Sequence, residues 1–264
     1  MTRLAIHGAA GRMGRRLVAL ASADDALSLA AAIDHANHPD LGQDAGQLAG
    51  VGDLAVALTD ALGSDADCDA LIDFSLPEGS RRALADCVSR KLPIVVGTTG
   101  LTADDDRALD DAAKSIPVLQ ATNFSLVVNV MWKLAGQAAQ LLEGYDIEVL
   151  EAHHRMKKDA PSGTAMTLAH KLCEATGRDP KKDLVFTRHG DDAQRQPNEI
   201  TVQTLRIGDD PGQHTAYFAG LGERLEIRHV STSRDSYALG ALRAAKWLAG
   251  QQAGRYDMAD VLNF

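Results

Sequence analysis

The stretch that decides the fold is RLAIHGAAGRMG, residues 3–14. Its short apolar run predicts a strand over 3–8, and the apolar spacing that follows predicts a helix over 14–23. Gly8, Gly11 and Gly14 connect the two elements. Glycines in this context permit a tight turn and let the backbone approach a pyrophosphate, which the first N–H groups of the helix then bind. The stretch therefore predicts a loop that binds a dinucleotide.

The acidic residue Asp34 supports this interpretation. It ends a second strand candidate over 27–34, where a carboxylate is suited to the ribose hydroxyls of an adenosine. The loop spacing is Gly-x-x-Gly-x-x-Gly, so an ordinary tight turn and a surface Asp remain an alternative. Asp34 favours a free 2′-hydroxyl, whereas Arg12 and His35 offer charge to a 2′-phosphate. We expect NADH to be used at least as well as NADPH.

Strand and helix candidates alternate up to about residue 125. Thr102 precedes an acidic first turn and is expected to cap its helix. Alternation at this spacing predicts a parallel sheet with helices on both faces. The further strands are expected at 69–75, 91–100 and 116–125, and the helices at 77–90 and 101–115.

Two short turns follow predicted strands, at the edge where open parallel sheets bind ligands. Their small residues permit close backbone approach, and the threonine hydroxyls suit a nicotinamide carboxamide. Simple turn chemistry is the alternative. The turns are Gly97-Thr98-Thr99-Gly100 and Ala121-Thr122-Asn123-Phe124.

The pattern changes after residue 126 to one long helix followed mainly by strands. The loops GDDPGQ and GLGE are interpreted as hairpin connections. A helix over 162–177 should end at Gly177. The remaining candidates are a helix at 126–144, strands at 146–154, 199–208, 214–220 and 224–233, and a helix at 235–250.

These elements predict an α/β protein with two domains. The first is a Rossmann-like, doubly wound dinucleotide-binding domain formed by 1–125 and 235–264. The second, 126–234, is an α+β substrate-binding and oligomerisation domain with a mixed sheet. Its hairpin-rich part offers a sheet face that no predicted helix covers.

Composition restricts the function classes. The chain has 264 residues, 45% of them apolar, and a net charge of −9, so a nucleic-acid-binding face is not expected. Three cysteines without a Cys-x-x-Cys pair argue against disulfides and structural zinc. No signal peptide is apparent, and no apolar run approaches the ~18–20 residues of a membrane span. We expect a cytoplasmic protein without a metal.

The segment EAHHRMKKDAPSGT, residues 151–164, carries the densest chemistry. His153 and His154 point to opposite faces of a strand, and no third ligand follows, which argues against a metal site. A solvated basic patch is the plain alternative. However, Ser162-Gly163-Thr164 begins a helix, whose first N–H groups bind anions. Together with the lysines, this predicts a site for a small carboxylate-bearing molecule beside a titrating imidazole.

The whole chain resembles the dihydrodipicolinate reductase family. The resemblance rests on GAAGRMG, DFS-x-PEG, VGTTG, ATNFS and, above all, EAHHR-x-K-x-DAPSGTA. It implies NAD(P)H-dependent reduction of a cyclic dicarboxylate, 4-hydroxy-tetrahydrodipicolinate, to tetrahydrodipicolinate in diaminopimelate and lysine synthesis. Hydride is delivered to C4 and water is lost. It also implies a homotetramer built on the second domain's sheet.

The resemblance also implies residue roles. His153 would be the general acid/base and Lys157 the second proton donor, while Met156 and Lys158 stay outside the motif that carries chemistry. Substrate would be bound by His154, Gly163 and Thr164. Cofactor would be bound by Gly8, Ala9, Ala10, Gly11, Arg12, Met13, Asp34, Gly97, Thr98, Thr99, Ala121, Thr122, Asn123 and Phe124.

Two alternatives remain open at this point. One is another nicotinamide-dependent enzyme of similar plan, such as an amino-acid or semialdehyde dehydrogenase. The latter needs a catalytic cysteine, and Cys68, Cys87 and Cys173 all lie away from the predicted ligand turns. The other is a regulator that senses NAD(H), which would need a DNA-binding element. Binding of NADH without turnover would favour the regulator over an enzyme.

Overall fold

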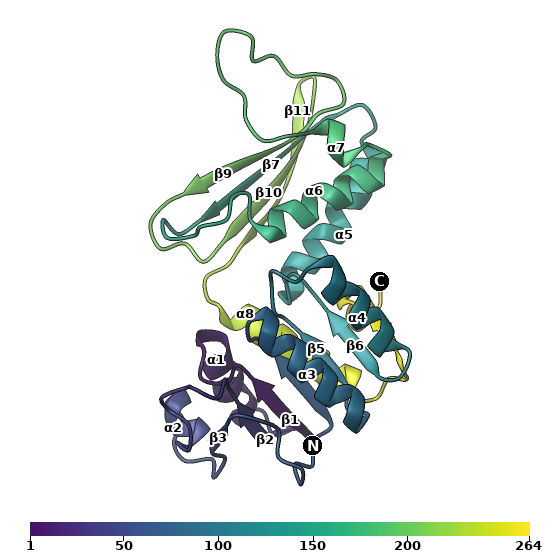
Figure 1. Ribbon diagram of the computed structural model, residues 1–264. Helices are drawn as coiled ribbons and strands as arrows, with labels where there is room; N and C mark the ends of the chain where they lie inside the picture. Colours follow the sequence, from purple (N-terminus) through teal and green to yellow (C-terminus); the bar gives the residue numbers. More distant parts are fainter. The chain divides into compact units, whose positions relative to one another are not determined.

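The computed structural model describes residues 1–264, which divide into two compact units. The first comprises Met1–Ser125 and Asp235–Phe264, and the second Leu126–Arg234 (Figure 1). Each unit has a sheet of its own and a separate hydrophobic core. The α/β fold class predicted from the sequence is confirmed.

The first unit is built on a seven-stranded parallel sheet with the order β12-β6-β5-β4-β1-β2-β3. The order runs in both directions from β1, as in a doubly wound fold. Its strands are β1 (Thr2–His7), β2 (Leu27–Ile33), β3 (Leu58–Thr59), β4 (Ala70–Asp73), β5 (Ile94–Val96), β6 (Pro117–Gln120) and β12 (Gly254–Tyr256).

Helices cover both faces of this sheet. On β1, Leu4 and Ile6 join a core with α1 and α8, whereas Ala5 joins the core under α3 and α4. This alternation is the two-faced burial expected of a parallel strand. Thr102 caps α4 in a capping box with Asp105, as the sequence predicted. The helices are α1 (Arg12–Ser22), α2 (Ala45–Ala49), α3 (Pro77–Arg90), α4 (Ala103–Ala113), α8 (Asp235–Leu248) and α9 (Met258–Leu262).

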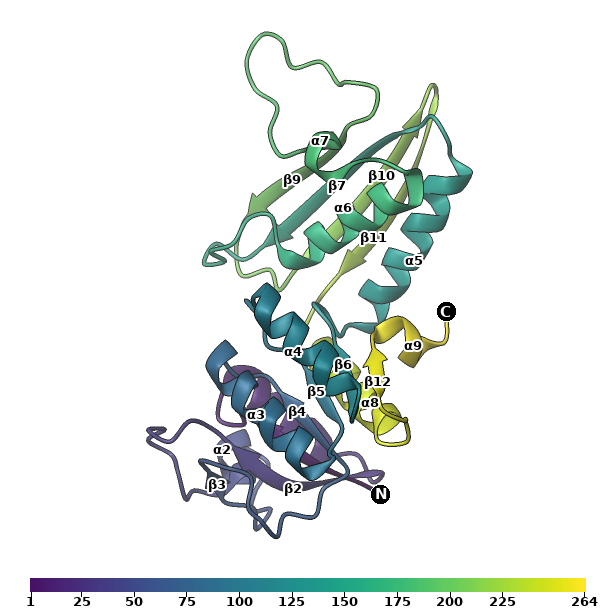
Figure 2. The same ribbon diagram turned by 45° about the vertical axis from the view of Figure 1, so that its right-hand side comes forward.

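The second unit is a five-stranded mixed sheet with the order β11-β10-β7-β9-β8. The helices α5 and α6 pack on one face of it (Figure 2). The helix α6 ends at Gly177, as predicted. The elements are α5 (Leu126–Leu141), β7 (Asp146–His153), α6 (Gly163–Thr176), α7 (Pro180–Asp183), β8 (Leu184–Val185), β9 (Ile200–Arg206), β10 (Gln213–Gly220) and β11 (Glu223–Val230).

The topology of this sheet corrects one sequence prediction. The GLGE loop does connect an antiparallel hairpin, β10 and β11. The GDDPGQ loop does not, because β7 lies between β9 and β10 and pairs with β9 in parallel and with β10 antiparallel.

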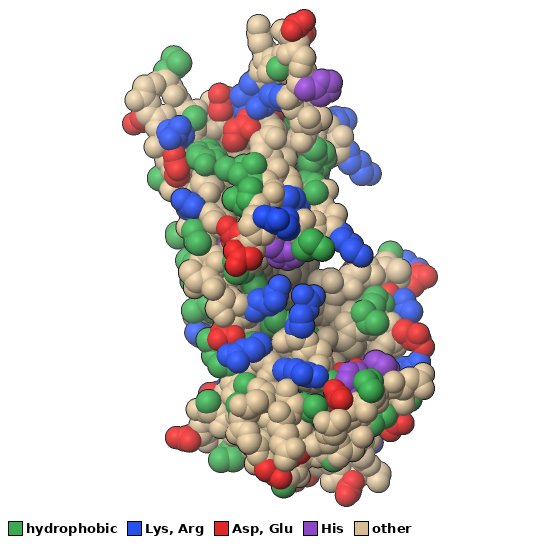
Figure 3. All heavy atoms as spheres, turned by 90° about the vertical axis from the view of Figure 1, so that its left-hand side faces the viewer, with side chains coloured by type: hydrophobic (Ala, Val, Ile, Leu, Met, Phe, Trp, Pro, Cys, Tyr) green, Lys and Arg blue, Asp and Glu red, His purple; other side chains and the backbone are tan.

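Six short elements have no counterpart in the sequence prediction: α2, β3, α7, β8, β12 and α9. Each has five residues or fewer, which is too short for a periodic signal. None of the helices has the length and apolarity needed to cross a membrane. One face of the molecule carries many Lys and Arg side chains, with Asp and Glu side chains around them (Figure 3).

Candidate functional site

The glycine loop of the first unit is shaped by close backbone packing. Gly8 has a φ of +79°, and a Cβ at this position would lie 2.5 Å from the Phe74 carbonyl oxygen. A Cβ on Gly14 would lie 2.0 Å from the Gly8 carbonyl oxygen. The loop therefore requires glycine at both positions. The N–H groups of Gly8–Gly11 are used within the fold, so the donors for a pyrophosphate would be the first-turn N–H groups of α1.

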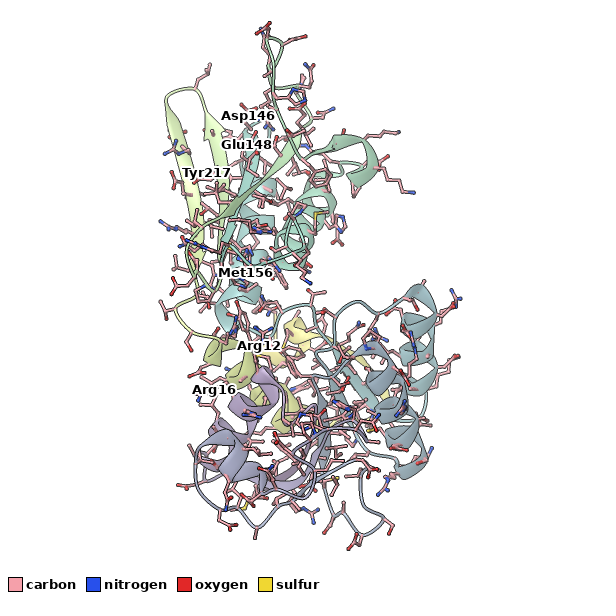
Figure 4. The ribbon with its side chains drawn as sticks, turned by 60° about the vertical axis from the view of Figure 1, so that its left-hand side comes forward. Arg12, Arg16, Asp146, Glu148, Met156 and Tyr217 are labelled. Carbon is pink, nitrogen blue, oxygen red and sulfur yellow. The ribbon has the colours of Figure 1, made fainter.

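Asp34 lies next to this loop, directly after β2. Its carboxylate accepts hydrogen bonds from the Ala10 N–H at 3.0 Å and from the His35 N–H at 2.9 Å. The loop and Asp34 thus form one structure, although they are separated in the sequence by a helix and a strand. Ala9 and Ala10 are buried, whereas Arg12 is exposed at the start of α1 (Figure 4). Contacts from Ala9, Ala10 and the partly buried Met13 would therefore be made by backbone.

A cavity of about 760 Å³ opens beside the loop. Gly8, Gly11 and Asp34 line it, and its size fits one end of a dinucleotide. Its charged lining is mainly acidic, since Arg82 is itself ion-paired with Glu78. The other ionisable side chains on its wall are His7, His35, Asp60 and Asp86.

A buried carboxylate that the sequence analysis missed, Asp73, links His7, which precedes the glycine loop, to Thr98 in the turn after β5. It accepts hydrogen bonds from the hydroxyls of Ser75 at 2.6 Å and Thr98 at 2.7 Å, and it contacts His7 Nδ1 at 2.8 Å. Burial alone would raise the pKa of Asp73, but the hydrogen bond and charge of His7, together with hydrogen bonds from Ser75 and Ser80, outweigh it and lower that pKa. Asp73 is the first residue of the DFS motif, but its burial could not be predicted from the sequence.

The two turns after β5 and β6 are placed differently from each other. The Thr98 hydroxyl is committed to Asp73, whereas Thr99 is exposed. In the second turn, the Asn123 side chain accepts the Ser125 N–H at 2.8 Å, and Phe124 is buried against Phe74. Gly97 is half-buried and Thr122 exposed. Thr99 and Thr122 are thus the exposed side chains of these turns.

The second unit holds the histidine segment at the end of β7. His153 is the last residue of the strand, is 7% exposed, and contacts the carboxylate of the fully buried Glu151 through Nδ1. His154 follows the strand and is half-buried. Lys157 lies in the next loop and donates to both oxygens of Asp159, at 2.8 and 2.9 Å.

The neighbours of this loop define what it can bind. Met156 (Figure 4) is 76% exposed, so its side chain does not pack into the site. The segment ends at Ser162, whose side chain caps α6 by accepting the Ala165 N–H. A Cβ on Gly163 would meet nothing within 4 Å, so the first turn of α6 is open on that side. The first-turn N–H groups of a helix favour an anion here.

Two further buried histidines, which the sequence analysis did not single out, pack beside His153. The rings of His153 and His214 are 5.3 Å apart, and those of His214 and His229 are 5.9 Å apart. Burial lowers the pKa of His214 to about 3, so this ring is neutral at ordinary pH. These histidines lie on β10 and β11, which are distant in sequence from the motif, so their proximity to His153 could not be predicted.

Metal-ligand geometry occurs elsewhere. Asp34, His35 and His38 offer ligand atoms that lie within 4.8 Å of one another. Asp34 already accepts two backbone N–H groups of the dinucleotide loop region, and His35 is exposed. Asp34 and His35 belong to the wall of the predicted cofactor cavity, and the group does not include any residue of the histidine segment.

Comparison with known proteins adds independent findings. Two family models match, "Dihydrodipicolinate reductase, N-terminus" over residues 2–124 and "Dihydrodipicolinate reductase, C-terminus" over residues 127–262. The 4-hydroxy-tetrahydrodipicolinate reductase of Syntrophotalea carbinolica is 47% identical over 268 residues, covering 99% of each chain. That of Myxococcus xanthus is 46% identical and covers 100% of this chain and 98% of its own.

Solved structures share the fold. The dipicolinate-bound dihydrodipicolinate reductase from Paenisporosarcina sp. TG-14 aligns with a TM-score of 0.76 at 22% identity, covering 98% of both chains. An amine dehydrogenase from Mycobacterium smegmatis aligns with a TM-score of 0.63 at 13% identity, covering 97% of this chain and 94% of its own. At these identities the likeness concerns architecture.

Proposed function

The chain belongs to the dihydrodipicolinate reductase family, oxidoreductases of lysine and diaminopimelate biosynthesis, and we propose that it reduces 4-hydroxy-tetrahydrodipicolinate to tetrahydrodipicolinate. In this reaction the substrate loses water and gains a hydride at C4 and a proton. The observation that carries the proposal is the buried His153–Glu151 pair next to the open first turn of α6. It offers a proton carrier beside an anion site, which a dicarboxylate substrate needs.

The first unit would hold the nicotinamide cofactor. The glycine loop and the first turn of α1 would hold the pyrophosphate, and Asp34 fits the adenosine ribose. The turns after β5 and β6 would hold the nicotinamide end. When bound, the reduced nicotinamide supplies the hydride. We propose no metal in the reaction, since proton transfer by side chains suffices.

The acidic cavity supports a preference between the two cofactors. A 2′-phosphate near Asp34 would face Asp60, Glu78 and Asp86, while Arg82 is engaged by Glu78. Repulsion between like charges would weaken the binding of NADPH. We therefore propose that NADH is used at least as well as NADPH. A clearly lower KM for NADPH than for NADH would contradict this.

The second unit would bind substrate and donate protons. His153 would act as general acid/base, because it is held by Glu151 and lies at the carboxyl end of β7, the central strand of the sheet. Lys157 would be the second proton donor, with Asp159 as its resting partner. The N–H groups of Gly163 and Thr164 would bind one carboxylate, and His154 would contact the substrate.

Assembly through the second unit is proposed on the same grounds. The face of its sheet away from α5 and α6 carries exposed apolar residues, including Leu205 and Val230. Sheet faces of this kind pack against other sheets. We propose a homotetramer that assembles through this face and works in the cytoplasm. Light scattering should give four times the chain mass of 28.0 kDa, and a monomer would contradict the proposal.

The function is tested by following the oxidation of reduced nicotinamide. The substrate is generated in the cuvette by a synthase from pyruvate and aspartate semialdehyde. Oxidation should require the complete mixture and should occur with NADH. Binding of NADH without any substrate-dependent oxidation would reject the proposed reaction and favour a sensing role.

A further inference from the structure

We propose that Glu151 is a positioning residue for His153: its buried carboxylate fixes the Nδ1 proton, leaves Nε2 as the nitrogen that exchanges protons, and ties the histidine to the start of α6. This inference rests on the proposed function, since it assigns the role of Glu151 in that reaction. It concerns a residue outside the catalytic and binding sets described above.

The contacts of Glu151 use its whole carboxylate. The residue has no exposed surface. One oxygen contacts His153 Nδ1 and accepts from Arg206 Nη1 at 3.0 Å. The other accepts from Arg206 Nη2 at 3.0 Å, from the Ser162 N–H at 3.0 Å, and from the Thr204 hydroxyl at 3.1 Å. A buried carboxylate with so many donors is held ionised.

His153 and Arg206 together keep the carboxylate of Glu151 ionised. Burial alone would raise the pKa of Glu151, but the hydrogen bonds from His153 and Arg206 outweigh it and lower that pKa to about 2. An ionised carboxylate can only accept hydrogen bonds. The His153 Nδ1 must therefore carry a proton whether the ring is neutral or cationic. The second proton of the imidazolium is then gained and lost at Nε2.

The same carboxylate connects the two parts of the substrate unit. Its bond to the Ser162 N–H fixes the residue that caps α6, directly before Gly163 and Thr164. The acid/base histidine and the proposed anion site thus share one anchor in the core. A loss of this anchor should disturb the direction of His153 and the start of α6 together.

The other charged and titratable groups around His153 are few. Arg206 lies on β9, His214 on β10 and His229 on β11. Lys157 and Asp159 lie in the loop that follows β7 and pair with each other. His214 is neutral through burial, so Glu151 and Arg206 are the charged groups closest to the Nδ1 side of the ring.

The test compares Glu151→Gln with a matched control, Glu148→Gln. Glu148 lies on the same strand but on the opposite face, beside Tyr217 (Figure 4), and it too is ion-paired, with Arg188 at 2.8 Å. We expect Glu151→Gln to lower kcat at least ~10-fold, and up to the ~10⁴-fold seen when a triad aspartate becomes asparagine. The Kd for NADH should stay within about twofold, and Glu148→Gln should keep kcat within about twofold.

The decisive readout is the tautomer of His153, measured by ¹⁵N NMR and assigned by comparison with His153→Gln. Wild type should show the proton on Nδ1, and Glu151→Gln should show a mixture of tautomers and an altered pH profile of kcat/KM. A proton on Nε2 in neutral wild-type His153 would overturn the inference, even if the variant does not fold. So would a variant with unchanged kcat and tautomer. If the wild-type protein binds NADH but does not reduce the substrate, the proposed function is wrong. The NMR measurement still shows in that case whether Glu151 fixes the tautomer of His153.

Discussion

Gly14 lies directly on Gly8, since a Cβ at position 14 would be 2.0 Å from the Gly8 carbonyl oxygen. The position of a Cβ is set by the backbone of residue 14, and the oxygen belongs to the backbone of Gly8. Neither atom can move aside unless the loop opens. We expect Gly14→Ala to raise the Kd for NADH by at least ~10-fold and to destabilise the first unit by ~1–3 kcal/mol, as overpacking does. Fluorescence titration with NADH and thermal unfolding measure the two effects.

Gly136 provides the control for this variant. It lies inside α5, and a Cβ there would meet its nearest neighbour at 3.8 Å, an ordinary contact. Gly136→Ala should therefore leave NADH binding unchanged and stabilise the protein by ~0.4–1 kcal/mol. Equal NADH affinity in Gly14→Ala and wild type would show that the loop does not bind the cofactor.

The proton donors should affect turnover more than binding. His153→Gln and Lys157→Ala each remove a group proposed to act in the chemical step, so kcat should fall ~10²–10⁴-fold. The substrate KM should change much less in His153→Gln. Steady-state kinetics with saturating NADH separates the two constants. Near-normal kcat in both variants would remove these residues from the catalytic step.

The first turn of α6 should act on binding instead. Besides its backbone N–H, Thr164 is proposed to donate its side-chain hydroxyl to one substrate carboxylate, and this interaction is present before and during the reaction. We expect Thr164→Ala to raise the substrate KM about 3- to 30-fold, the loss of ~1–2 kcal/mol that one hydrogen bond to a charged group is worth. The kcat should change less than KM. A variant in which kcat alone falls would contradict the assignment.

The buried histidines predict a loss of stability in mild acid. The pKa of His214 is lowered to about 3 in the folded chain, against ~6.5 when unfolded. As the pH falls below ~6.5, the unfolded chain gains a proton that the folded chain cannot bind until about pH 3. One such group lowers the free energy of unfolding by up to ~1.4 kcal/mol for each pH unit between ~6.5 and about 3.

His214→Gln tests this sign. Denaturant unfolding between pH 6.5 and 5 should show a steep loss of stability in wild type and a smaller slope in the variant. Some slope should remain, because burial also lowers the pKa of His229. Glu151 affects stability only at lower pH. Its pKa is about 2 in the folded chain and ~4.3 in the unfolded chain, so its contribution to stability is lost as the pH falls below ~4.3. Identical slopes in wild type and His214→Gln would contradict the account.

Local signals in the sequence were sufficient for the principal elements. Pro77 at the start of α3, Thr102 before α4 and Gly177 after α6 are start and stop signals whose chemistry acts within a few residues. The pairing of β7 with β9 was missed, because a parallel pair brings together segments about 50 residues apart, and the interpretation of a short loop favoured a hairpin.

The site could be predicted only as far as its motif extends. His153, Lys157 and Gly163 lie within one stretch of the sequence, so their chemistry was apparent. Glu151 belongs to the same stretch but was overlooked, since its role depends on burial and on Arg206, which lies 55 residues away. Asp73 was overlooked for the same reason. Convergence of distant residues on a buried carboxylate leaves no spacing signal in a single sequence.

The most direct test of the proposed reaction follows the hydride itself. NADH carrying deuterium at the transferable C4 position is oxidised with the substrate formed in the cuvette, and the product is examined by NMR and mass spectrometry. Deuterium at C4 of tetrahydrodipicolinate is the predicted result. A product without deuterium, or with deuterium at another carbon, would contradict the proposed reaction.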